Sequence, residues 1–110
     1  MKKKLKVLIV KPNKNPYPLE IDADLKSMQN VVGGDIQAVY PFEDDFVALI
    51  CAEEGKLLGY PLNRPLVHPE YGVYDVVAGT FFLCSAPPDA ENFESLSEEQ
   101  IKKYTRIFKL

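Results

Sequence analysis

The sequence predicts an α+β fold: a single, mostly antiparallel sheet with two helices packed on it, in the order β-β-α-β-β-(β)-loop-β-α, with residues 1–110 forming a single domain. Three observations support this. Within several short segments, side chains alternate between two faces, as they do in β-strands. Two other segments have a helical apolar stripe and capping residues at their ends. Short polar turns join most of the elements, which favours antiparallel pairing because parallel strands need long crossovers.

The first two strands are predicted to form a hairpin. Residues 4–11 have apolar side chains on both faces, which is typical of a strand inside a sheet. The turn at 12–16 holds two prolines and two asparagines, and a second strand follows at 17–22. Pro18 has no amide donor, so the second strand is expected at an edge of the sheet.

Both helices show signals at their ends. The first is predicted over residues 22–32, with Asp22 or Asp24 as its N-cap and Gly33-Gly34 as its stop. The second follows Ser97, which has capping-box spacing to Gln100.

The middle of the chain is predicted to add further strands and one loop. Residues 61–72 hold three prolines between 61 and 69, and we expect an irregular loop there. The predicted strands are 35–42, 46–52, an optional one at 57–60, and 73–85 with a bulge or close backbone approach at Gly79.

Composition excludes several classes of protein. Hydrophobic residues make up 46% and charged residues 26% of the chain, which excludes a disordered or fibrous protein. No apolar run approaches the roughly 20 residues of a membrane helix, so we expect no membrane partner and a cytoplasmic location. Cys51 and Cys84 are expected to be reduced core thiols, although a disulfide between neighbouring strands stays open. We expect no metal and no cofactor, because His68 is the only histidine and no CxxC spacing occurs.

Charge is distributed unevenly along the chain. The segments 1–14 and 101–110 carry only cations and sum to +10, whereas residues 15–100 sum to −13. Cations at the two ends could form one phosphate-binding patch, with Lys3, Lys6, Lys102 and Arg106 as candidates. The alternative is that they protect a sheet edge and complement a helix dipole.

The residue inventory does not favour catalysis. No serine elbow, phosphate-binding loop or dinucleotide motif is present. The carboxylates at 43–45 and 53–54 have the spacing of solvated turns, so we expect no catalytic residue. A small enzyme would need His68 and Arg64 in one pocket with an acid.

The 59–72 segment supplies the candidate binding residues Asn63, Arg64 and His68. A guanidinium held in a proline-rich segment can clamp a carboxylate or phosphate. Alternatively, Arg64 pairs with an acid such as Asp75 and pins the loop.

Several strings resemble a known family. They are the residues 32–42 (VGGDIQAVYPF), 61–64 (PLNR) and 74–84 (YDVVAGTFFLC), with the helix start SLSEEQI. Together they resemble the bacterial domain of unknown function 3846 family, from about Lys6 to Tyr104. The resemblance implies an association with bacterial chromosomes, phages and mobile elements, and it supplies no catalytic residue to carry over to this sequence.

We therefore expect a non-enzymatic, cytosolic accessory or protein-interaction domain of a bacterial or mobile-element genome. Its contact surface would be the 59–72 segment, with an unknown protein partner or a second copy of the chain forming a homo-oligomer. A nucleic-acid-associated protein using the basic ends is the less favoured alternative.

Overall fold

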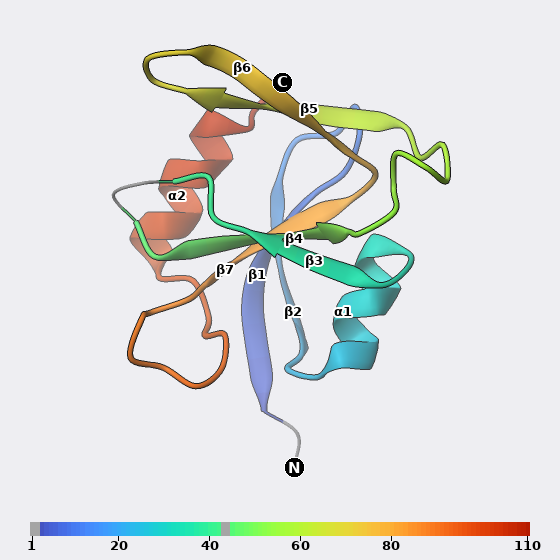
Figure 1. The fold of residues 1–110 in the computed structure, drawn as a ribbon. Coiled ribbons are helices and arrows are strands. Elements are labelled where there is room, and N and C mark those ends of the chain that lie inside the picture. The colour runs from blue at the N-terminus through green and yellow to red at the C-terminus, as the bar shows by residue number, and fades with distance from the viewer. Residues whose placement is uncertain (1–2, 43–44) are drawn as a thin grey trace.

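The fold is α+β, as predicted, in a computed structural model that describes residues 3–42 and 45–110. The predicted acidic turn at 43–45 is therefore described only at Asp45. A five-stranded antiparallel sheet has the order β2-β1-β7-β4-β3, and a separate two-stranded sheet pairs β5 with β6 (Figure 1). The elements are β1 (Lys4–Val10), β2 (Tyr17–Asp22), α1 (Leu25–Val32), β3 (Ile36–Val39), β4 (Val47–Ala52), β5 (Leu62–His68), β6 (Gly72–Ala78), β7 (Phe81–Ser85) and α2 (Glu98–Ile107).

The five-stranded sheet is covered on both faces. α1 packs on one face, and α2 together with the β5–β6 hairpin covers the other (Figure 1). Alternation along each strand divides the core between these faces. The α1 side holds Leu5, Val7, Ile9, Ile50 and Phe82, and the α2 side holds Leu8, Val10, Leu49, Phe81 and Leu83.

The first hairpin and both helices confirm their sequence signals. β1 pairs with β2 from Lys4↔Asp22 to Ile9↔Tyr17. Of the two alternative N-caps for α1, Asp24 is the one used, and its carboxylate accepts from the Ser27 amide at 2.7 Å. Gly33 ends this helix with a φ of 82°. α2 has the predicted capping box between Ser97 and Gln100.

The prediction of one sheet and of a loop at 61–72 was wrong. Residues 62–68 form β5, which pairs with β6 as a separate sheet. Pro65 is tolerated because the register shifts between Leu62 and Pro65, so an amide donor is not required there. The optional strand at 57–60 is a turn instead, with Gly59 at a φ of 74°.

The segment predicted as one strand at 73–85 is two strands. β6 ends at Ala78 and β7 begins at Phe81, so the chain passes from the small sheet to the large one at Gly79. Gly79 has a φ of 83°, and an added Cβ would lie 2.9 Å from Cδ2 of Tyr60. The close approach predicted at Gly79 is therefore present, and it marks a change of sheet.

Within the described ranges, neither helix has the length and apolar character needed to cross a membrane.

Candidate functional site

Arg64 anchors the β5–β6 hairpin to the rest of the protein. Its side chain is only 7% exposed. Its guanidinium donates to the carbonyl oxygens of Phe108 (3.0 Å), Lys11 (3.3 Å) and Lys14 (2.5 Å) and to Oδ1 of Asn63 (2.8 Å). These bonds join β5, the β1–β2 turn and the end of α2 at one point. Burial lowers the pKa of the guanidinium.

Asn63 continues the same anchor. Its amide nitrogen donates to the carbonyl oxygens of Val10 (2.8 Å) and Gly79 (2.9 Å), while its own oxygen accepts from Arg64. The alternative pairing of Arg64 with Asp75 does not form, since Asp75 forms an ion pair with Lys56. The two candidates Asn63 and Arg64 therefore lie together and point into the protein.

His68 lies apart from them, at the end of β5 next to the hairpin turn. Its ring stacks on Tyr71 with centroids 4.5 Å apart. Its Nδ1 accepts from the Glu70 amide at 3.1 Å, which closes the turn.

The tip of the hairpin exposes large apolar side chains. The hairpin tip patch comprises Val67 (58% exposed), Tyr71 (78%), Val73 (60%) and Tyr74 (54%). Val67 and Val73 are direct cross-strand partners, so their side chains share a face. Glu70 is the only charged residue between 65 and 74. The patch is therefore apolar, aromatic and nearly uncharged.

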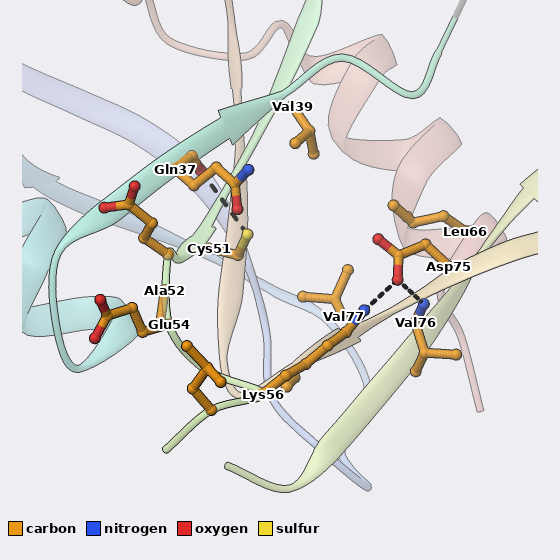
Figure 2. Close-up of a pocket in the computed structure, with 13 residues that line it drawn as sticks. Gln37, Val39, Cys51, Ala52, Glu54, Lys56, Leu66, Asp75, Val76 and Val77 are labelled. Carbon is orange, nitrogen blue, oxygen red and sulfur yellow. Dashed lines mark hydrogen bonds and ion pairs between the residues drawn. The ribbon is translucent and has the colours of Figure 1, made fainter. Parts of the chain in front are cut away.

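A cleft of about 270 Å³, here called the hairpin cleft, lies between β6 and the strands β3 and β4 (Figure 2). In Figure 2, Val39 and Leu66 lie at one end of it, and Glu54 and Lys56 lie towards the other. Its walls are mostly apolar and its rim is polar. The apolar residues are Val39, Cys51, Ala52, Leu57, Leu66, Val76, Val77 and Ala78, and the polar ones are Gln37, Glu53, Glu54, Lys56 and Asp75.

The rim of the hairpin cleft is closed on one side by an ion pair. The Lys56 ammonium binds Asp75, which also accepts from the Val76 amide at 2.8 Å. The bond from Lys56 holds the pKa of Asp75 below its usual value. The pair ties β6 to the turn after β4.

The thiols are not activated. Burial raises the pKa of Cys51, which lines the cleft and lies 3.9 Å from the Gln37 carbonyl oxygen. Burial raises the pKa of Cys84 to about 12. Both cysteines are free, and they belong to core clusters on opposite faces of the sheet, so the open disulfide alternative does not form. A protonated, buried thiol is a poor nucleophile.

A second cleft of about 420 Å³ lies on the other side of β5, against the end of α2. Its lining includes Arg64, Pro65, Leu66 and Phe108, so Leu66 separates the two clefts. His68 lines neither of them.

Three of the four candidate terminal cations lie on or beside α2. Lys6 forms an ion pair with Glu98 at 3.2 Å, and Lys102 and Arg106 follow Glu98 at helical spacing along α2. Lys3 precedes β1, and its carbonyl accepts from the Ala23 amide at 2.9 Å. The structure thus brings three of the candidates to one side, with an acid among them.

Other cations are gathered by the Arg64 anchor. Arg64 binds the carbonyls of Lys11 and Lys14, and the Leu110 amide donates to Oδ1 of Asn15 at 2.9 Å. Lys11, Lys14 and Lys109 are therefore brought to one end of the molecule, here called the basic end. The sequence indicated that the two termini are basic, but not which lysines meet.

Among residues 3–42 and 45–110, no three histidine, cysteine or acidic side chains are grouped so that they could hold a metal ion.

The fold and the site together define a small α+β protein with a firmly anchored, apolar-tipped hairpin beside a cleft. The family model described as "Domain of unknown function (DUF3846)" matches residues 4–109, so the chain belongs to this family, as the sequence resemblance indicated. No curated protein matches the chain, and no solved structure does.

Proposed function

We propose that the protein is a non-enzymatic protein-interaction domain that contacts its partner through the hairpin tip patch. The observation that carries this is the set of four large side chains at the tip, each more than half exposed: Val67, Tyr71, Val73 and Tyr74. Exposed apolar and aromatic side chains are characteristic of protein contacts, whereas a phosphate backbone needs cations.

The reactive groups support a binding role over a catalytic one. The Arg64 guanidinium is occupied by three carbonyls and an amide oxygen. His68 uses Nδ1 to close a turn, and the Cys51 thiol is held protonated by burial. Arg64 serves the proposed contact indirectly, because it fixes the base of the hairpin that presents the patch.

The proposal also covers the location of the protein and the kind of genome that encodes it. Two free, buried cysteines, Cys51 and Cys84, suit a reducing cytoplasm. A role as an accessory component of a bacterial or mobile-element genome rests on the family resemblance alone.

The experiment places a photocrosslinking amino acid at Val67 or Val73 and, as a control, at Leu25, which is 56% exposed but lies on α1. Crosslinks formed in host cells are then identified by mass spectrometry. We expect one protein to be captured from both tip positions and not from Leu25. In vitro, its binding should change little between low and high salt and be lost in Val67→Lys. Equal capture from all three positions contradicts the proposal, and capture of the chain itself identifies a homo-oligomer.

The basic end favours nucleic acid as a second candidate partner. Lys11, Lys14 and Lys109 are brought together there, and no acid lies among residues 1–14 or 101–110. Binding through phosphates would weaken steeply as salt rises, and Lys14→Glu with Lys109→Glu would reduce the slope. The variant pair Lys102→Glu with Arg106→Glu makes the same change in charge on α2, where the sequence predicted the basic patch, and serves for comparison.

A further inference from the structure

β3 leaves one edge of the five-stranded sheet open. In the described part of the chain it pairs with β4 alone. Proteins usually protect such edges with prolines, charges, bulges or very short strands. β2, at the opposite edge, carries Pro18, Glu20 and Asp22, whereas β3 reads Ile-Gln-Ala-Val and has only its length of four residues as protection.

The backbone of β3 presents hydrogen-bonding groups outward. The Glu53 amide donates to the Asp35 carbonyl at 2.8 Å, and the register continues with Gln37↔Cys51 and Val39↔Leu49. Hydrogen-bonded pairs alternate in an antiparallel ladder, so Gln37 and Val39 bond to β4. The amide and carbonyl groups of Ile36 and Ala38 therefore point away from β4.

The side chains of β3 connect this edge to the hairpin cleft. Gln37 and Val39 line the cleft, whereas Ile36 and Ala38 pack against the α1-side core. A strand added beside β3 would place every second side chain on the cleft side. The cleft, at about 270 Å³, is smaller than most small-molecule sites, which run from about 300 to 1,000 Å³, so it suits one large side chain.

The charges at the rim define the occupant further. Lys56 and Asp75 neutralise each other, whereas Glu53 and Glu54 form no ion pair within the described ranges. The rim thus keeps an excess of negative charge beside an apolar floor. A second copy pairing through β3 would offer no cation, because β3 has no basic residue.

We propose that the β3 edge and the hairpin cleft form a second binding site, which takes an extended segment of a partner protein carrying an aliphatic side chain and a basic residue two positions away. The aliphatic side chain enters the cleft beside Val39, and the basic one lies near Glu53 and Glu54. The main chain of the segment pairs with Ile36 and Ala38. This site is independent of the hairpin tip patch, so either proposal can fail alone.

The test uses a blocked peptide, Thr-Lys-Thr-Leu-Thr-Lys-Thr, titrated into isotope-labelled protein and followed by amide NMR. We expect saturable shifts at Ile36 and Ala38 and slower amide exchange at both. Glu54→Lys should weaken binding about fivefold, which corresponds to about 1 kcal/mol. Glu20→Lys makes the same charge change on β2 and should leave the affinity unaltered, as should Val67→Lys at the tip.

Three results would overturn the proposal. One is the absence of shifts at Ile36 and Ala38 up to the solubility limit of the peptide. Another is equal weakening by Glu54→Lys and Glu20→Lys, which would show attraction by overall charge. The last is a concentration-dependent shift at Ile36 without peptide, which would assign the edge to a second copy. Ala38→Pro removes an outward amide and no hydrogen bond to β4, so its spectrum should stay folded while binding is lost.

Discussion

Replacing Arg64 with methionine should destabilise the protein by about 3 kcal/mol. A hydrogen bond from a charged group contributes about 1.5–3 kcal/mol. The carbonyls of Lys11 and Lys14 lie in an exposed turn and can bind water instead, so little of their share is lost. The destabilisation therefore comes mainly from losing the hydrogen bonds to Phe108 and Asn63, and removal of the buried charge offsets part of this loss. A domain of this kind is stable by about 5–15 kcal/mol, so the variant should still fold.

Urea denaturation followed by circular dichroism and tyrosine fluorescence measures this change. Arg106→Met removes an exposed arginine from α2 and should alter the free energy of unfolding by less than about 0.5 kcal/mol. Arg64→Lys should recover less than half of the loss, because an ammonium cannot reproduce the planar fork. A loss below about 1 kcal/mol for Arg64→Met would refute the anchoring role.

Two further predictions concern the core. At Gly79, φ is 83° and an added Cβ would lie 2.9 Å from Cδ2 of Tyr60, whereas at Gly72 φ is 78° and no described atom lies within 4 Å of an added Cβ. Gly79→Ala should therefore lower the melting temperature more than Gly72→Ala in differential scanning fluorimetry. Equal losses would contradict the contact with Tyr60. The pKa of Cys84 rises from 9.0 to about 12 on folding, so the unfolded state loses this proton first and stability should fall as pH rises from 9 towards 12. Urea midpoints across this range should fall less steeply for Cys84→Ala, and parallel slopes would contradict the assignment.

Local signals in the sequence were sufficient for the elements whose partners are close in the chain. The capping box at Ser97 and Gln100 and the stop at Gly33 act within a few residues, and both helices formed as predicted. The β1–β2 hairpin likewise depends on its own turn.

The second sheet was missed because its cause is not local. Three prolines in residues 61–69 disfavour a strand inside a large sheet, but among the described residues β5 pairs only with β6, and its register shifts between Leu62 and Pro65. The largely apolar segment 73–85 concealed the change of sheet at Gly79, because both halves of it are strands.

Asn63 and Arg64 were predicted as binding residues, but their donors point to backbone carbonyls of the protein itself. Every residue has a backbone carbonyl, so no sequence pattern shows which carbonyls will accept these hydrogen bonds. The hairpin cleft was missed for a similar reason, since Gln37, Glu54 and Asp75 meet only after two sheets pack.

The anchor explains why two binding surfaces can coexist on so short a chain. Arg64 and Asn63 bind the base of the hairpin to Val10, Gly79 and Phe108, so the hairpin is held at its root. This attachment and the Lys56–Asp75 pair together hold β6 beside β3 and β4, where the hairpin cleft lies. Loss of Arg64 should therefore weaken peptide binding at the cleft and partner capture at the tip together, whereas Glu54→Lys should affect only the former.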